Sequence, residues 1–218
     1  MPRDTFDHQL NSLQEAIVRM GGSVDVALDR SIHALVERDP EEAHRVIADD
    51  LLTNQAQHDI EERCIVLLAT QQPMARDLRV IVAILNIVVE LERIGDYAEG
   101  IGKIALRLIP EPVLKPLIDI PRMAVVARGM VTDSIRAFME RDATLARSVA
   151  EGDDEVDALT DQVYRELLTY MLDDPKTIER ATHLMWVSHN LERSADRATN
   201  IAERVVQLVT GEIEELNP

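Results

Sequence analysis

Aromatic residues are scarce in this chain: two Phe, three Tyr and one Trp make up 3% of its 218 residues. Because 46% of the residues are nevertheless hydrophobic, the core must be built from Leu, Ile, Val, Ala and Met. Such a composition suits long helices packed side by side. It argues against a β-sandwich, which favours β-branched and aromatic residues.

Cysteine is almost absent as well. Cys64 is the one cysteine of the chain, so no disulfide can form within it. It lies in an apolar run, residues 64–68, and we expect it to be a buried, inert thiol.

Basic residues are outnumbered, with 23 Lys and Arg against 40 Asp and Glu, and the net charge is −17. This charge disfavours nucleic acid as a partner, because phosphate backbones are bound by basic residues. Anionic lipid surfaces are disfavoured for the same reason. The charge favours cations and basic protein patches instead.

Long apolar runs are also lacking. The most apolar stretch, Val80–Leu91, is interrupted by Asn86 and Glu90 and is too short to span a bilayer. The first five residues lead into no apolar signal core. We therefore expect no membrane insertion and a cytoplasmic protein.

Apolar residues recur every three or four positions through most of the chain, which is typical of amphipathic helices. The first such stripe runs from Phe6 to Leu35. Asp39-Pro40 and Asp174-Pro175 each combine a capping residue with a proline suited to a first helical turn. The pattern predicts six long helices, the later five over about 40–71, 73–108, 122–141, 143–173 and 175–211.

A cluster of prolines divides the chain in two. Pro110, Pro112, Pro116 and Pro121 crowd one short stretch between two periodic regions. We predict a first three-helix repeat over residues 1–109, a linker over 110–121 and a second three-helix repeat over 122–218. The predicted fold class is all-α, with two tandem elongated three-helix bundles.

The two halves also share a motif. Leu91-Glu92-Arg93-Ile94-Gly95-Asp96 corresponds to Leu191-Glu192-Arg193-Ser194-Ala195-Asp196, 100 positions later. Repetition at a fixed spacing is the organising feature of this sequence.

The repeated acids are candidate metal ligands. Glu92 and Asp96 lie on one helical face, where two like charges destabilise a helix unless a positive charge intervenes. Glu192 and Asp196 repeat the arrangement, and the same stripe continues to Asn200 and Glu203. Clusters of oxygen ligands suit magnesium, manganese, iron or zinc.

Two other helices present polar residues in the middle of an apolar stripe, and these are further candidates: Asn54, His58, Asp157 and Asp161. The alternative is that all these acids form a solvated face, as isolated acids on helices usually do.

Catalytic motifs have little support. The segment Gly95–Lys103 lacks the strand and the hydroxyl residue of a phosphate-binding loop. Glu41-x-x-His44 has the spacing found in di-iron bundles, but it occurs once. No nucleophile–base pair is evident, so we predict that the chain is not an enzyme.

With these residues in view, the chain resembles the PhoU family of accessory proteins of bacterial phosphate-specific transport. The most specific parts of the resemblance are residues 71–79, Gln-Gln-Pro-Met-Ala-Arg-Asp-Leu-Arg, and the paired Leu-Glu-Arg-x-x-Asp motifs. The second motif continues as residues 198–203, Ala-Thr-Asn-Ile-Ala-Glu. The resemblance covers nearly the whole chain.

The resemblance implies two three-helix bundles related by pseudo-twofold symmetry, often as a homodimer. It also implies metal at the acidic motifs, often in multinuclear clusters, with acids of the second and fifth helices completing each site. PhoU-like proteins are negative regulators of phosphate-starvation signalling and phosphate uptake. The resemblance implies a link between the ATPase subunit of the phosphate transporter and a sensor histidine kinase.

Two departures from symmetry matter. Gly100 and Lys103 stand where the second repeat has Asn200 and Glu203, and a lysine on the ligand stripe repels a cation. Glu99 could partly compensate. The second repeat also lacks a counterpart of the segment 71–79. Two other readings remain open: a carboxylate-bridged di-metal enzyme and a metal-free helical scaffold.

Overall fold

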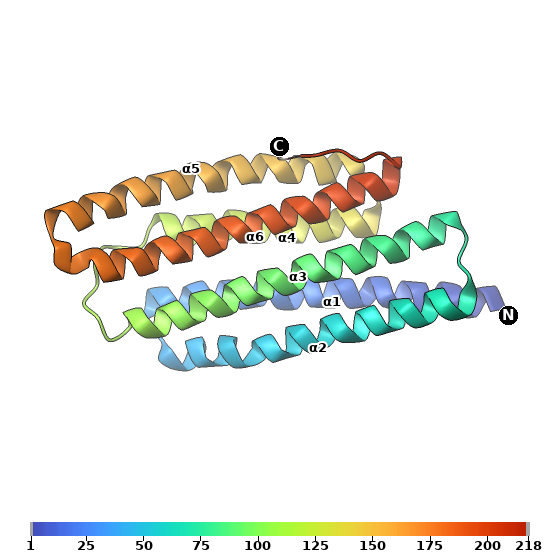
Figure 1. Cartoon of the computed structure of the whole chain (residues 1–218), viewed down its shortest axis with the longest axis horizontal. Coiled ribbons are helices and arrows are strands. Elements are labelled where there is room, and N and C mark those ends of the chain that lie inside the picture. The colour runs from blue at the N-terminus through green and yellow to red at the C-terminus, as the bar shows by residue number, and fades with distance from the viewer. Residues whose placement is uncertain (1, 217–218) are drawn as a thin grey trace.

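The computed structural model describes residues 2–216, with side chains described from Asp4 onward. Within that range the chain forms six long α-helices and one short 3₁₀ helix, and it forms no strand (Figure 1). The elements are α1 (Pro2–Glu37), α2 (Pro40–Gln71), α3 (Ala75–Leu108), α4 (Asp119–Glu140), α5 (Ala143–Asp173), η1 (Pro175–Thr177) and α6 (Ile178–Thr210). The predicted all-α class is confirmed. The outer limits of the two predicted repeats, residues 1 and 218, lie outside the described range.

Local sequence signals fix where the helices begin. The Asp39 carboxylate accepts hydrogen bonds from the backbone N–H groups of Glu41 and Glu42, at 2.9 and 3.0 Å. Asp142 caps α5 in the same way. Each cap satisfies backbone donors that have no partner within their own helix. One expectation is corrected: α4 begins at Asp119, inside the stretch expected to be linker, because proline is tolerated in a first turn and Pro121 does not delay the helix.

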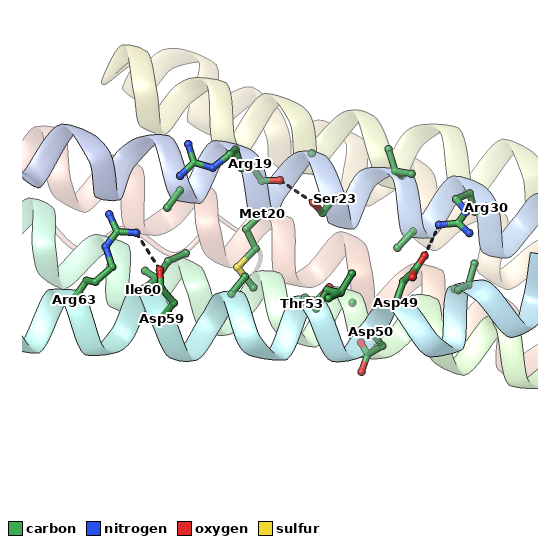
Figure 2. Close-up of a pocket in the computed structure, with 18 residues that line it drawn as sticks. Arg19, Met20, Ser23, Arg30, Asp49, Asp50, Thr53, Asp59, Ile60 and Arg63 are labelled. Atoms are coloured by element: carbon green, nitrogen blue, oxygen red, sulfur yellow. Dashed lines mark hydrogen bonds and ion pairs between the residues drawn. The ribbon is translucent and has the colours of Figure 1, made fainter.

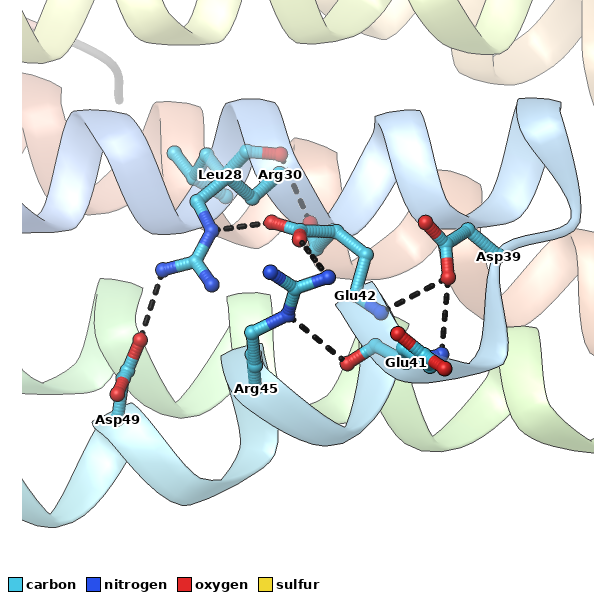
Figure 3. Close-up of polar contacts among 8 residues, drawn as sticks. Leu28, Arg30, Asp39, Glu41, Glu42, Arg45 and Asp49 are labelled. Carbon is cyan, nitrogen blue, oxygen red and sulfur yellow. Dashed lines mark hydrogen bonds and ion pairs between the residues drawn. The ribbon is translucent and has the colours of Figure 1, made fainter.

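The first turns of α2 are tied to α1 by an ionic network. Arg30 of α1 contacts both Glu42 and Asp49, the latter at 2.7 Å. Arg45 lies 3.3 Å from Glu42 on the other side (Figure 3). Because each charge has an opposite partner, this network is a structural clamp between α1 and α2.

The helices pack as two bundles that lie side by side. α1, α2 and α3 contact one another, as do α4, α5 and α6. The bundles meet through α3 against α6 and α1 against α4, so α3 and α6 run through the centre of the molecule (Figure 1). The core is mainly aliphatic, with fully buried side chains such as Ile17, Ile87, Leu91 and Leu191.

Contacts across the junction relate the two repeats by a pseudo-twofold axis. Asp25 of α1 and Arg128 of α4 occupy equivalent positions, 103 residues apart, and they bind each other at 2.8 Å. Ser31 and Ser134 are also equivalent, and each donates to the carbonyl three residues earlier, at 2.8 Å. The symmetry implied by the resemblance is present in the structure.

Polar contacts also hold the connecting segments. Arg38 donates to the carbonyl of Glu111 at 2.8 Å, and Arg180 donates to the carbonyl of Pro112 at 2.9 Å. After α6 the chain turns at Gly211, and Glu214 binds Arg147 at 2.8 Å. None of the helices in the described part of the chain is apolar over a length sufficient to cross a membrane.

Candidate functional site

The first acidic cluster lies between α2 and α3. Asp50 and Asn54 come from α2, and Glu92, Asp96 and Glu99 come from α3. The Asn54 amide donates to one carboxylate oxygen of Asp50 at 2.8 Å. The other oxygen, Oδ1, is buried and has no hydrogen-bond partner. A buried carboxylate oxygen without a donor is unusual, and it is an available ligand for a cation.

Close approach of α2 and α3 builds this cluster. Gly95 lies between Glu92 and Asp96, against the buried Thr53 of α2. A Cβ atom at Gly95 would stand 2.9 Å from Thr53 Cγ2 and 3.5 Å from Asp50 Oδ1. The glycine therefore allows the two helices to approach until the acids share one region.

Crowding of like charges raises the proton affinity of the cluster. Burial raises the pKa of Asp50, and the charges of Asp96 and Glu99 raise it further. Burial and then Asp96 and Asp50 raise the pKa of Glu92. Partial burial and then Glu99 raise the pKa of Asp96. A bound cation would relieve this repulsion.

The lysine noted in the sequence lies beside the first cluster. Lys103 Nζ is 2.6 Å from Glu99 Oε2. Its charge lowers the pKa of Asp50 and Asp96, against the larger effects of burial and the other acids. Lys103 therefore supplies part of the positive charge that a metal would otherwise provide.

The second acidic cluster lies between α5 and α6, with Asp153 and Asp157 on α5 and Glu192 and Asp196 on α6. Asp153 is only 3% exposed. Burial, then the charges of Asp196 and Asp157, raise its pKa from 3.8 to about 6. Burial and then Asp196 raise the pKa of Glu192. Arg193 lies 2.6 Å from Asp196, so a positive charge also stands beside the second cluster.

The two clusters occupy equivalent positions. Asp153 and Asp157 follow Asp50 and Asn54 by 103 positions, and Glu192 and Asp196 follow Glu92 and Asp96 by 100. The pseudo-twofold axis therefore relates not only the helices but also the acids that lie between them.

Six of the ten residues predicted as ligands belong to these clusters: Asn54, Glu92, Asp96, Asp157, Glu192 and Asp196. His58 and Asp161 lie one turn farther along, with side chains 77% and 79% exposed. His58 is 3.9 Å from Glu61, and Asp161 is 3.8 Å from Arg165.

Asn200 and Glu203 have other partners in this structure. Asn200 donates to Glu90 of α3 at 3.3 Å, across the junction between the repeats. Glu203 accepts from the backbone N–H of Leu216 at 2.9 Å and so fastens the C-terminal segment.

The predicted ligands omitted Asp50 and Asp153, which the structure places in the clusters, and Glu99 was named only as a partial compensation for Lys103. A signal was available, because Asp50 and Asp153 occupy the polar middle of their stripes at equivalent positions. They were omitted because a stripe alone does not show which of its polar residues faces the neighbouring helix.

The donor set fits a cation, but the side chains do not yet enclose one. Within residues 2–216, no three Asp, Glu, His or Cys side chains converge closely enough to share an ion. Binding by three ligands therefore requires carboxylates to rotate toward each other. Carboxylate oxygens are suitable ligands for magnesium and manganese, and also for zinc and iron.

A groove lies between α1 and α2. It has a volume of about 710 Å³, and Arg19, Arg30 and Arg63 lie along it (Figure 2). All three arginines have acidic partners: Arg30 with Asp49 at 2.7 Å, Arg63 with Asp59 at 3.0 Å and Arg19 with Glu15 at 3.9 Å. Asp50, Thr53 and Gly95 also line the groove, so it borders the first cluster, although the Asp50 side chain points away from α1 (Figure 2).

Comparison with known proteins agrees with this arrangement. The model of the PhoU domain matches the chain twice, over residues 17–105 and 120–205. The phosphate-specific transport system accessory protein PhoU homolog of Aquifex aeolicus (strain VF5) is 43% identical over 94% of this chain and 93% of its own length. The homolog of Caulobacter vibrioides (strain NA1000 / CB15N) is 41% identical over 95% and 91%.

Solved structures show the same fold. The crystal structure of PhoU from Pseudomonas aeruginosa has a TM-score of 0.91 and 36% identity, covering 95% of this chain and all of the other. That of the phosphate transport system regulatory protein PhoU from Streptococcus pneumoniae has a TM-score of 0.89 and 32% identity, covering 96% and 99%.

These relatives are named as accessory or regulatory proteins, which supports the prediction that the chain is not an enzyme. The double match of the domain, the sequence identity over nearly the whole length and the shared fold lead to one assignment: this chain belongs to the PhoU family.

Proposed function

We propose that this chain is a metal-binding regulatory adaptor of phosphate transport. Its relatives are named accessory or regulatory proteins of phosphate transport systems, and this supports a regulatory role in phosphate homeostasis. The observation that carries the metal proposal is the repeated cluster of carboxylates with raised pKa values, placed at equivalent positions of both bundles.

Each cluster would hold metal between two helices. Asp50, Glu92, Asp96 and Glu99 would bind it in the first repeat. Asp153, Asp157, Glu192 and Asp196 would bind it in the second. When bound, the cation supplies positive charge that neutralises the carboxylates, and its bonds link α2 to α3 and α5 to α6. Iron, zinc, manganese and magnesium are all compatible with the oxygen donors, and clusters of this size can accept more than one ion.

The adaptor would act through partners in the cytoplasm. We propose that it contacts the ATPase subunit of the phosphate ABC transporter and a phosphate-sensor histidine kinase, as a homodimer. In this role it restrains phosphate uptake and keeps the starvation response off when phosphate is plentiful. The net charge of −17 favours contacts with basic patches on such partners.

Metal content tests the first part of the proposal. We would purify the protein, Glu92→Ala/Asp96→Ala and Glu192→Ala/Asp196→Ala, and measure bound metal by elemental mass spectrometry. We expect metal in the parent protein and a loss with each double substitution, larger for the second pair because Lys103 weakens the first cluster. Glu212→Ala/Glu215→Ala is the matched control, since it removes two exposed acids outside both clusters.

Two outcomes would contradict the proposal in different ways. If the parent protein stays empty on titration with each of the four metals, the acids form a solvated face and the chain is a metal-free helical scaffold. If metal binds but a strain lacking the gene shows a normal phosphate-starvation response, the chain binds metal without regulating phosphate signalling.

A further inference from the structure

A pocket of about 280 Å³ lies between the first half of α3 and the last turns of α6. Leu78 and Val82 of α3 line it with exposed apolar side chains, and Met74, just before α3, is exposed as well. Positions 74, 78 and 82 are four residues apart, so they follow one face of the chain as it enters the helix. An exposed apolar strip beside a pocket favours a surface that another molecule covers.

Two arginines make this pocket basic. The Arg79 side chain reaches the end of α6, where a Cβ atom added to Gly211 would stand 3.3 Å from its Nη1 atom. Arg204 donates to Oε1 of Gln207 at 3.1 Å. Within residues 4–216, neither guanidinium forms an ion pair with a carboxylate, although the chain has 40 Asp and Glu. The basic pocket, defined by residues 78, 79, 82 and 204, therefore keeps its positive charge, which favours an acidic ligand.

The pseudo-twofold axis relates the basic pocket to a second pocket of different charge. Glu179 occupies the position equivalent to Arg79, and Ile104 occupies that of Arg204, each at an offset of 100. Both line a pocket between the end of α3 and the beginning of α6. Since the fold accepts an acid and an apolar residue at these positions, it does not require the two arginines. Their charge is available for binding.

An acidic segment begins at the rim of the basic pocket. Gly211 lines the pocket, and residues 212–216 follow it with the sequence Glu-Ile-Glu-Glu-Leu. Ile213 is 79% exposed. Glu212 and Glu215 are exposed and form no ion pair within the described part of the chain. The segment thus presents an apolar side chain between two acids that have no basic partner.

The acidic segment is already held in one conformation. Glu214 is bound to Arg147 of α5, and the backbone N–H of Leu216 is bound to Glu203 of α6. These contacts fasten the segment to its own bundle and leave the Ile213 side chain facing solvent. A segment that is ordered before it binds loses little conformational entropy on association.

We propose that the acidic segment of one copy of this chain docks on the basic pocket of a second copy, and the reverse. A twofold dimer needs one surface that is complementary to itself, and the basic pocket and the acidic segment lie side by side on such a surface. In the dimer, Ile213 would cover Leu78 and Val82. The acids of the segment would face the two arginines of the pocket. The inference rests on the proposed homodimeric adaptor and names the surface through which it pairs.

Oligomeric state tests the proposal. Because the surface is small, we expect a dissociation constant of roughly 1–100 µM, which sedimentation velocity over that range measures. Arg79→Glu introduces the residue of the second repeat, and Glu212→Arg reverses the charge of the segment. Each should weaken the dimer about tenfold or more, because like charges would then face each other. Higher salt should weaken the parent dimer as well.

A mixture of these two variants gives the most specific result. In a mixed dimer of Arg79→Glu with Glu212→Arg, each pocket faces a segment of opposite charge. The equal mixture should therefore recover most of the lost affinity, although neither variant pairs with itself. Glu179→Arg is the matched control, because it reverses a charge in the pseudo-equivalent pocket and should leave the dimer unchanged. Thermal unfolding checks that every variant is folded.

Dimer formation and metal binding can be separated. Glu212→Ala/Glu215→Ala should weaken the dimer and keep its metal, whereas Glu92→Ala/Asp96→Ala should lose metal and keep the dimer. A monomeric chain that binds metal and regulates the starvation response would refute the dimer alone.

Three results would overturn the inference. The first is a parent protein that stays monomeric throughout the range. If Arg79→Glu then weakened binding to the ATPase subunit or the kinase, the pocket would serve an acidic segment of that partner instead. The second is a dimer that both charge reversals leave unchanged, which would place the interface on another face. The third is a mixture that recovers no affinity, which would show that the two segments do not meet.

Discussion

Asp153 shows how strongly a single acidic residue is affected by its surroundings. The residue is 3% exposed, and burial together with neighbouring acids raises the pKa of its carboxyl group from 3.8 to about 6. At a pH between 3.8 and about 6, Asp153 holds a proton in the folded protein that it has released in the unfolded chain. In the metal-free protein, the contribution of Asp153 to the free energy of unfolding should therefore decrease as the pH rises from about 4 to about 6.

Asp153→Asn should remove this pH-dependent cost. A shift of about two pKa units corresponds to about 3 kcal/mol at most, and we expect the metal-free variant to gain about 1–3 kcal/mol at pH 7. Urea unfolding at pH 4 and pH 7 measures the effect, after metal has been removed with a chelator. Asp154→Asn, at the exposed neighbouring position, should change stability by less than about 0.5 kcal/mol. Equal stabilities of the two variants at pH 7 would show that the Asp153 charge carries no cost.

Individual site residues were predictable only in part. Glu92, Asp96, Glu192 and Asp196 stand out because the motif is repeated. His58 and Asp161 share a stripe with the cluster residues but lie eight positions after Asp50 and Asp153. Eight residues of a helix with 3.6 residues per turn rotate the side chain by about 80°. The same rotation separates Asn200 from Glu192, and it directs Asn200 toward α3 instead of α5.

Among the elements, α2 and α3 approach each other closely at Gly95. Gly95→Ala would place a methyl group 2.9 Å from Thr53 Cγ2, and Thr53 is itself buried. We expect α2 to shift away from α3, with a loss of about 1–3 kcal/mol in stability and weaker metal binding at the first cluster.

Gly22→Ala is the matched control, because nothing lies within 4 Å of the added Cβ atom and α1 is helical there. This variant should gain about 0.5–1 kcal/mol from helix propensity. Urea unfolding of both variants separates the two effects. Stabilisation of both by a similar amount would show that α2 and α3 can separate at no cost.

The helices themselves were well predicted because their signals are local. Asp39, Asp142 and Asp174 cap helices with their own side chains, and such caps can be read directly from the sequence. The close packing at Gly95 could not be predicted in the same way. A glycine inside a helical pattern signals a close approach only when the neighbouring helix is known.

On the scale of the whole molecule, Asp25 and Arg128 join the two bundles across the pseudo-twofold axis. Both side chains are largely buried, with 25% and 28% of their surfaces exposed. The hydrogen bond to Asp25 raises the pKa of Arg128, against the smaller lowering effect of burial, and the charges of Asp25 and Asp29 raise it further.

An exchange of the two charges tests this junction. Asp25→Arg or Arg128→Asp alone should cost about 2–4 kcal/mol, since each leaves two like charges facing each other. Asp25→Arg/Arg128→Asp together should recover most of that loss, because the two positions are related by the axis. The recovery should be incomplete, since Asp29 also contacts Arg128 and Thr132 stands at its equivalent position. Chemical unfolding of the three variants gives the coupling energy, and additive losses would refute a direct pairing.

The charge difference at Asp25 and Arg128 also determines which bundles can pair. If the first bundles of two chains met through α1, Asp25 would face Asp25, and if two second bundles met through α4, Arg128 would face Arg128. Only a first bundle and a second bundle bring opposite charges together at this position. One chain contains a first bundle and a second bundle. Like-charge repulsion therefore opposes the pairing of two first bundles, or of two second bundles, from neighbouring molecules during folding. The opposite charges at these two equivalent positions thus disfavour pairing of identical repeats.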